Sequence, residues 1–247
     1  MNKTTAIIIG IILLCFGGFV TWSITHSGSE SETETVEYDS TTIIQPSTDN
    51  GEIGDHARGY LDSPVIVIEY ADFQCPGCAS IHPKTSTLFE EYGDRVAFVF
   101  RNFPIKGHPN ARASASAVEA AGLQGYFFEM AEIVFANQAV WSYASGSERT
   151  NIFVELFQQA ATAGNIDQFK SDMAGSRVSK KINFDFDLGN KKDNVTGTPF
   201  FLVNGVHIDL SDSTTSSDFF VIMREKIDAK LAEFDLPTGP ATTQTEE

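Results

Sequence analysis

Apolar residues in this chain form runs and periodic stretches that predict alternating strands and helices. Two stretches, Val65–Tyr70 and Val96–Phe100, carry the continuous apolar runs of strands that are buried on both faces. The segment between them, Ala79–Tyr92, stops at Gly93 and is typical of a helix. Two parallel strands joined by a helix form a right-handed βαβ unit, so we expect the folded part to begin with one.

A long helical region is predicted to interrupt the sheet. Apolar and alanine-rich positions at helical spacing predict helices over 110–123, 126–137, 150–163, 165–174 and 176–190. Thr150 is the expected cap of the third of these helices. The last range also alternates like a strand between Ile182 and Leu188, and we assign it as a helix.

A strand, a hairpin and a helix are predicted to close the folded part. Phe200–Val203 is an apolar strand, and Asn204–Gly205 is a strong two-residue hairpin turn into Val206–Leu210. A final helix over about 217–234 is expected to follow, with its core-facing residues at spacings of three and four. These residues are Phe220, Met223, Ile227, Leu231 and Phe234.

An uncharged apolar segment near the N-terminus predicts a membrane span. Residues 6–24 would extend about 28 Å as a helix, which is close to the hydrocarbon thickness of a bilayer. We interpret residues 1–25 as an uncleaved anchor, with a cleaved signal peptide as the alternative. Lys3 precedes the segment and no Lys or Arg follows it before Arg58. This distribution favours a single-pass protein of the cell membrane with its folded part on the extracytoplasmic side.

Composition narrows the remaining possibilities. Residues 26–54 and 237–247 have few apolar side chains, and we expect a disordered acidic linker and a disordered tail. The net charge of −16, without a basic stripe, argues against nucleic acid as a partner. Of the 3 cysteines, Cys15 lies in the apolar segment, so only Cys75 and Cys78 remain for chemistry in water. This count excludes a framework of structural disulfides.

Cys75 and Cys78 lie where a predicted strand gives way to a predicted helix. The free N–H groups and the dipole at a helix start stabilise an anion, and they lower the pKa of a cysteine placed there. The offset of three residues brings Cys78 within reach of a disulfide with Cys75, which predicts a dithiol switch. The alternative is a structural zinc site in which His82 and a fourth ligand, such as His108 or Asp72, join the two thiols.

The element order and three motifs resemble the DsbA-like family of thiol-disulfide oxidoreductases. The motifs are Glu69–Cys78, then Phe100–Pro104 with His108–Ala111, and Val195–Gly205 with its Thr-Pro-Phe-Phe segment. The resemblance implies an α/β, thioredoxin-like fold with an inserted α-helical subdomain, preceded by one N-terminal transmembrane helix. The thioredoxin-like parts would be residues 55–108 and 193–236, and the helical insertion would be residues 109–192.

The resemblance also implies roles for individual residues. Cys75 matches the exposed nucleophile and Cys78 the resolving thiol of a redox-active disulfide. Pro199 matches a proline that follows a cis peptide bond and faces the dithiol, so Pro199 and the preceding Thr198 are expected to bind substrate. Glu69 matches a buried acid behind the motif. We interpret it as the acceptor of a proton from Cys78 through water, with a buried acid of purely structural role as the alternative.

One position departs from the family pattern. Gly77 stands where the best-known oxidising members have a histidine that helps to stabilise the thiolate. Strong oxidising power is therefore not implied for this chain.

The expected activity is oxidation or exchange of disulfides in exported proteins. The expected partners are cysteine-containing exported client proteins and a membrane redox partner that recharges the dithiol, and no cofactor is needed. The direction of exchange depends on a redox potential that sequence does not supply. The alternative is a non-catalytic peptide-binding chaperone, or a Cys/His zinc-binding module, on the same fold.

Overall fold

The structure is a computed structural model that describes residues 38–211 and 216–241. The predicted membrane anchor, residues 26–37 of the predicted linker and residues 242–247 of the predicted tail lie outside the described residues. The elements of the described chain are β1 (His56–Gly59), β2 (Ile66–Ala71), α2 (Pro76–Tyr92), β3 (Ala97–Asn102), α3 (Ala111–Gly122), α4 (Phe127–Ala136), α5 (Gln138–Trp141), α6 (Gly146–Ala160), α7 (Ile166–Met173), α8 (Ser176–Lys191), β4 (Phe200–Val203), β5 (Val206–Ile208) and α9 (Ser216–Glu233).

The described strands form one five-stranded sheet in the order β1-β3-β2-β4-β5. Strands β2 and β3 run parallel, with register from Ile66 opposite Ala97 to Ala71 opposite Asn102, and α2 connects them. The predicted βαβ unit is therefore confirmed. The predicted β4–β5 hairpin is confirmed as well, with Val203 opposite Val206. Because β2 and β3 are parallel, the loops that follow them lie at the same edge of the sheet.

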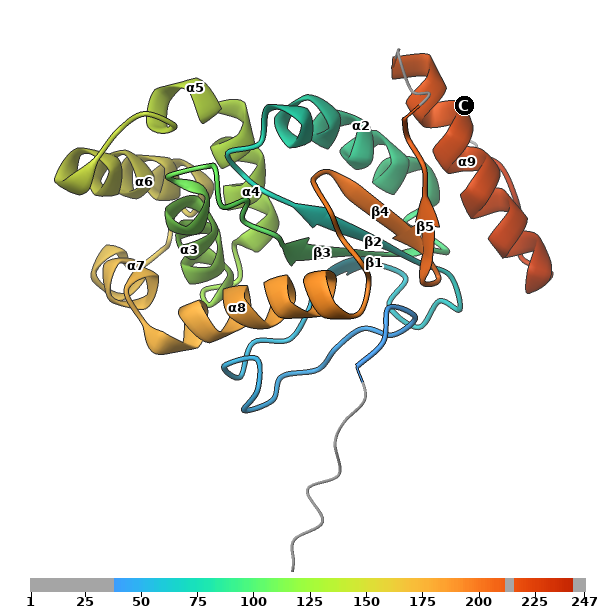
Figure 1. The fold of residues 1–247 in the computed structure, drawn as a ribbon, viewed down its shortest axis with the longest axis horizontal. Coiled ribbons are helices and arrows are strands. Elements are labelled where there is room, and N and C mark those ends of the chain that lie inside the picture. Colours follow the sequence, from blue (N-terminus) through green and yellow to red (C-terminus); the bar gives the residue numbers. More distant parts are fainter. Residues whose placement is uncertain (1–37, 212–215, 242–247) are drawn as a thin grey trace, which may run out of the picture. The chain divides into compact units, whose positions relative to one another are not determined.

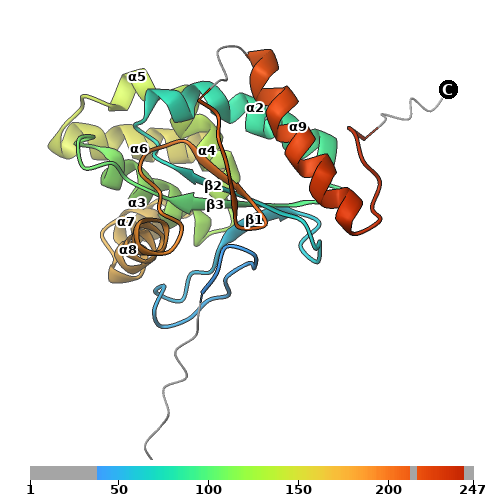
Figure 2. The same ribbon diagram turned by 45° about the vertical axis from the view of Figure 1, so that its right-hand side comes forward.

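Helices cover both faces of the sheet (Figure 1). Helices α2 and α9 lie on one face, where Val67, Phe98 and Phe201 pack against Leu88 and Met223. Helix α8 lies on the other face, as Figure 2 shows from a second direction, and its Phe186 contributes to the apolar cluster there. The strands that carry these residues are buried on both faces, which explains their continuous apolar sequences.

The predicted helical insertion is present between β3 and β4 as α3–α8. Its helices share an apolar cluster with Ala71 of β2 and Phe100 of β3, and the alanines of α3 let neighbouring helices approach closely in it. Phe73, from the loop after β2, joins this cluster, and the centroids of its ring and of the Phe135 ring in α4 lie 4.7 Å apart. The insertion therefore packs directly against the segment that leads into the Cys-x-x-Cys motif.

The prediction of a disordered linker is wrong for residues 38–54. Ile44 is only 4% exposed, and its backbone N–H and C=O pair with the Asp55 side chain and backbone N–H at 2.9 and 2.7 Å. Asp55 in turn binds the fully buried Arg101 of β3 at 2.8 Å. Buried residues such as Ile44, and the ion-paired Asp55 that follows the segment, hold it in place although its average composition is polar.

Four further expectations need correction. Helix α6 starts at Gly146 with Ser145 as its N-cap residue, so Thr150 lies inside the helix. In α9, Phe219 lies in the core instead of Phe220, which is only partly buried. Phe234, expected to face the core, follows α9 and is 45% exposed.

The fourth correction concerns the predicted disordered tail. Residues 237–241 are held in place, because the Gly239 N–H donates to Asp228 at 2.7 Å and the Ala241 N–H donates to the Glu91 carbonyl at 2.8 Å. None of the described helices is both long and apolar enough to cross a membrane.

Candidate active site

Cys75 is the N-cap residue of α2, with extended backbone angles and Pro76 in the first turn. No side chain caps this helix start, so its free backbone N–H groups are available to the Cys75 sulfur. The Cys75 side chain was expected to be exposed, but it is only 9% exposed. Cys78 lies one turn further on and is fully buried, and both cysteines are free thiols.

The two thiols have opposite pKa shifts. The hydrogen bond from the Cys78 side chain, together with the Thr198 side chain and the backbone N–H groups of Cys78 and Gly77, lowers the pKa of Cys75 to about 5 against the opposing effect of burial. Burial, followed by the interaction with Cys75, raises the pKa of Cys78 well above its ordinary value. At neutral pH Cys75 is therefore a thiolate and Cys78 a thiol. A thiolate is the form that attacks and leaves in disulfide exchange.

The loop before β4 faces the dithiol. The peptide bond between Thr198 and Pro199 is cis, and the Thr198 carbonyl lies 3.4 Å from Cys75 Sγ. Gly77 lies between these parts without a side chain, and a Cβ built on it would lie 3.3 Å from Pro199 Cδ and 3.6 Å from Cys75 Sγ. The structure thus brings Cys75, Cys78, Thr198 and Pro199 together from distant parts of the sequence.

Glu69 lies on β2 beneath α2 and is 5% exposed. Burial raises the pKa of its carboxyl to about 7, although the charge of Arg58 and a hydrogen bond with Thr85 oppose this shift. Its Oε1 atom has no hydrogen-bond partner. Glu69 is therefore a buried carboxyl that can gain and lose a proton near neutral pH.

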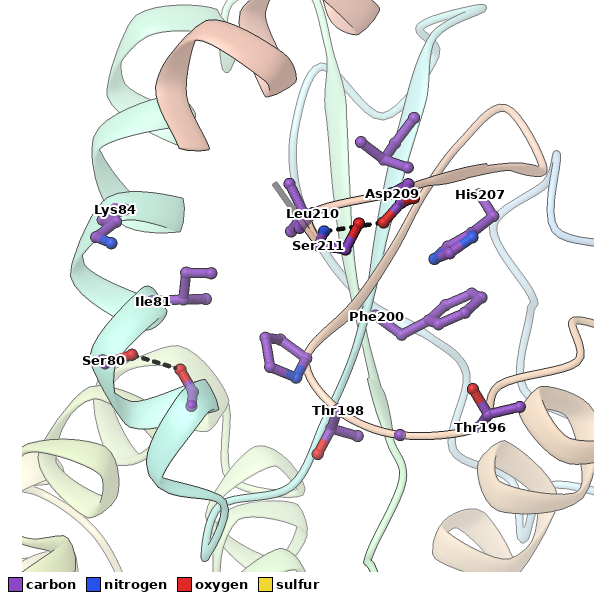
Figure 3. A pocket seen from close by; sticks show the side chains of 14 residues that line it. Ser80, Ile81, Lys84, Thr196, Thr198, Phe200, His207, Asp209, Leu210 and Ser211 are labelled. Atoms are coloured by element: carbon purple, nitrogen blue, oxygen red, sulfur yellow. Dashed lines mark hydrogen bonds between the residues drawn. The ribbon is translucent and has the colours of Figure 1, made fainter. Parts of the chain in front are cut away.

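A groove of about 680 Å³ opens beside the cis-proline loop. Ser80, Ile81 and Lys84 of α2 line one side, and Phe200 and His207 of β4 and β5 line the other (Figure 3). The rings of Phe200 and His207 are stacked, with their centroids 4.0 Å apart. The groove presents apolar, cationic and hydrogen-bonding side chains next to Pro199, which suits an extended peptide.

Comparison with known proteins places this geometry in a family. A sequence model of the thioredoxin family matches residues 52–220. The chain belongs to the thioredoxin family. In fold it resembles the DsbA-like thiol-disulfide oxidoreductases.

Solved structures of thioredoxin-family proteins share the fold. Oxidised BdbD from Bacillus subtilis is 25% identical with a TM-score of 0.59, and the match covers 79% of this chain and all (100%) of that one. Wolbachia pipientis alpha-DsbA1 is 22% identical with a TM-score of 0.57, covering 73% of this chain and 94% of that one. Pseudomonas aeruginosa DsbA2 is 20% identical with a TM-score of 0.53, covering 70% and 94%.

The curated relatives are much longer proteins. The Na(+)/H(+) antiporter NhaA 1 of Mycolicibacterium vanbaalenii is 34% identical over 158 residues, which are 62% of this chain and 24% of that protein. The Na(+)/H(+) antiporter NhaA 3 of Salinispora tropica is 36% identical over 153 residues, which are 61% of this chain and 22% of that protein. The matched region thus spans about a quarter of the length of these relatives.

Amide side chains hold the Cys75 loop of this thioredoxin-family chain in place. Gln138 Nε2, from α5, donates to the carbonyls of Phe73 and Cys75 at 2.8 and 3.1 Å. Gln74 Oε1 accepts from the Asn110 N–H at 2.6 Å. Sequence reasoning assigned no role to these residues. Gln74 and Asn110 lie inside the motifs that carry the family resemblance, whereas nothing in the sequence marks Gln138.

Asp72 and His108, the fourth ligands considered for a zinc site, bind each other. The buried Asp72 carboxylate accepts from His108 Nδ1 at 2.6 Å and from the N–H groups of Gln74 and Ile105 at 2.7 and 2.9 Å. These bonds connect the loop after β2 to the loop after β3. Across 38–211 and 216–241, no group of three or more His, Cys, Asp or Glu side chains is arranged to hold a metal ion.

Proposed function

We propose that this chain is a membrane-anchored, extracytoplasmic enzyme that oxidises or exchanges disulfides in exported proteins through Cys75 and Cys78. The observation that carries the proposal is the position of Cys75 Sγ at the start of α2, 3.4 Å from the carbonyl before the cis Thr198–Pro199 bond. This position provides a stabilised thiolate and, beside it, backbone to which a client can bind.

In the oxidising direction, a client thiolate attacks Cys75 Sγ of the Cys75–Cys78 disulfide. A client–Cys75 disulfide forms, the bond between the two cysteines breaks, and Cys78 leaves with the electron pair. A second client thiolate then attacks the client sulfur of the mixed disulfide, so that the client leaves oxidised and Cys75 leaves as a thiolate. The low pKa of Cys75 favours this second step, because a more stable thiolate is a better leaving group.

Cys78 needs a proton when it leaves, because its thiolate is strongly disfavoured in its buried position. Glu69 is the proposed proton donor, acting through water. Its pKa of about 7 lets a sizeable fraction of the carboxyl hold a proton at neutral pH. In the reverse direction Glu69 accepts the proton before Cys78 attacks a mixed disulfide.

The cis-proline loop is the proposed client-binding element. An extended client segment would pair with the Thr198 backbone by strand addition and would place its cysteine at Cys75. The groove lined by Ile81, Lys84 and Phe200 would receive the flanking client side chains.

Membrane anchoring by residues 1–25 rests on the apolar N-terminal sequence. The relatives named as Na(+)/H(+) antiporters add support, because an antiporter works in a membrane. A membrane redox partner is the proposed source of oxidising equivalents for the Cys75–Cys78 pair.

The test is oxidation of a reduced, unfolded, cysteine-containing client protein by the full chain. We expect Cys75→Ala to abolish oxidation and Cys15→Ala, the matched control at the third cysteine, to leave it unchanged. If Cys75→Ala oxidises the client at the wild-type rate, the proposal is wrong. The potential of the dithiol in glutathione buffers then decides the direction, with about −270 mV pointing to a reductase and about −120 mV to an oxidase.

A further inference from the structure

A small void lies beneath α2, on the side of the sheet that carries Glu69. Its volume is about 20 Å³, and its polar lining consists of Arg58, Glu69, His82 and Thr85. Two buried polar atoms of these residues, Glu69 Oε1 and His82 Nε2, have no hydrogen-bond partner. An unpaired buried polar group costs about 1–3 kcal/mol. A void of this size, lined by both residues, has room for one water molecule beside them.

A second, open pocket lies on the other side of His82. It has a volume of about 340 Å³ and is formed by α2 and α4, with Glu90 and Glu132 in its wall. Of the residues that line the two spaces, only His82 lines both. The imidazole is 9% exposed and packs against the ring of Phe135, with the centroids 4.6 Å apart. His82 therefore connects the Glu69 void with the open pocket.

The proposed activity requires a route of this kind. Glu69 gives a proton to Cys78 or takes one from it in each exchange, and it must return to its starting state before the next exchange. Direct contact with solvent is limited, because the remaining walls of the void include Val67, Phe98, Phe100 and Phe128. His82 is the titrating side chain that lines both the void and the outer pocket, so it provides a path out.

We propose that His82 carries protons between Glu69 and the solvent, and so acts on Cys78 through Glu69. This inference rests on the proposed function. When the Glu69 carboxylate must be reprotonated, it takes a proton from the water in the void. That water takes one from an imidazole N–H, and the other ring nitrogen takes one from solvent in the outer pocket. The net change is one proton from solvent to Glu69, and the reverse sequence releases it.

The charges around His82 suit transfer in both directions. Burial, and then the charge of Arg58 on β1, lowers the pKa of His82 to about 4, so the ring is neutral at rest. The negative charges of Glu132, Glu69 and Glu90 in turn stabilise the charged form of Arg58 against its burial. A neutral imidazole can donate at one nitrogen while it accepts at the other, whereas a permanently charged ring would hold its proton.

The test measures, at pH 8, the single-turnover rate at which the enzyme's disulfide oxidises a reduced client. At this pH most Glu69 carboxyls are ionised, so the proton for Cys78 must come from solvent during the exchange. His82→Phe keeps a ring against Phe135 but has no nitrogen. We expect this variant to react about tenfold more slowly, below the ~10²–10⁴ that direct acid–base groups supply, because His82 acts one step away. The ultraviolet titration of the Cys75 thiolate is expected to stay unchanged, which separates a lost relay from a disturbed fold.

Rescue and coupling make the test specific. In His82→Ala, imidazole added to the buffer can enter the outer pocket, and we expect the rate to rise with its concentration. Ser86→Ala, a matched control that lines only the outer pocket, should keep the wild-type rate without imidazole. In the Glu69→Gln background, His82→Phe should cause no further slowing, because the relay has lost its acceptor.

Other outcomes overturn the inference. They are a wild-type rate in His82→Phe, slowing of His82→Ala that imidazole does not relieve, and slowing that adds in full to that of Glu69→Gln. These results are distinct from failure of the proposed function, in which the unaltered chain would not oxidise the client at all.

Discussion

The low pKa of Cys75 can be tested by removing its strongest support. The hydrogen bond from the Cys78 side chain contributes most to lowering this pKa, followed among the favourable contacts by the Thr198 side chain. Cys78→Ala removes that donor and leaves Thr198, the backbone N–H groups and the position at the helix start in place. Cys78→Ser is the matched control, because its hydroxyl can still donate to the thiolate.

The expected shift follows from the strength of the lost bond. A hydrogen bond to a charged group contributes about 1.5–3 kcal/mol, and a thiol is a weak donor, so the lower figure applies. At 1.36 kcal/mol per pKa unit, this corresponds to a rise of about one unit. The pKa of Cys75 would move from about 5 to about 6 in Cys78→Ala. At pH 5 the thiolate fraction would fall from about a half to about a tenth.

The assay is the pH dependence of thiolate absorbance, or of the rate of alkylation, in variants that retain Cys75 as the only thiol of the folded part. We expect the midpoint of Cys78→Ser to stay near that of the wild type and the midpoint of Cys78→Ala to be higher. Equal midpoints in the Ala and Ser variants would refute the reasoning. The helix start and the cis-proline loop would then account for the whole shift.

Three further predictions follow from the same site. Burial raises the folded pKa of Glu69, so the free energy of unfolding falls as the pH rises from about 4.5 to about 7. Denaturant titrations at pH 8 should therefore find Glu69→Gln more stable than wild type by roughly 3 kcal/mol. Thr198→Val should raise the pKa of Cys75, and glutathione equilibria should show a potential that is lower by about 30 mV per pKa unit. In the reduced form, the lowered folded pKa of Cys75 contributes stability that is lost as the pH falls through about 5. Melting curves should therefore show the stability of the reduced form, relative to the oxidised form, growing between pH 5 and 8.

The parts of the fold that sequence predicts well are those in which local pattern and burial agree. Strand β4 starts and ends where its apolar run does, and the Asn204–Gly205 turn supplies the positive φ values that a tight hairpin needs. Helix α8 was ambiguous between Ile182 and Leu188, and both of these residues prove to be buried on one helix. Cys75 and Cys78 were identified because a helix start has a specific effect on a thiol.

The errors fall where long-range contacts outweigh local composition. Residues 38–54 are polar on average, but Arg101 of β3 and Lys181 of α8 both bind the buried Asp55 at the end of this segment. No periodic pattern reveals an ion pair between residues so far apart. Strand β1 escaped notice for a similar reason, since its four residues, 56–59, gain their strand structure from pairing with β3.

The absence of a histidine at position 77 changes how the thiolate is stabilised. The groups that lower the pKa of Cys75 are all neutral, namely the Cys78 thiol, the Thr198 side chain and backbone N–H groups. None of these donors titrates near neutral pH, because the pKa of Cys78 is raised well above its ordinary value. The charge on Cys75 therefore does not depend on a second nearby titration, as it would beside an imidazole. Gly77 also leaves the contact between Cys75 and the Pro199 loop free of a side chain.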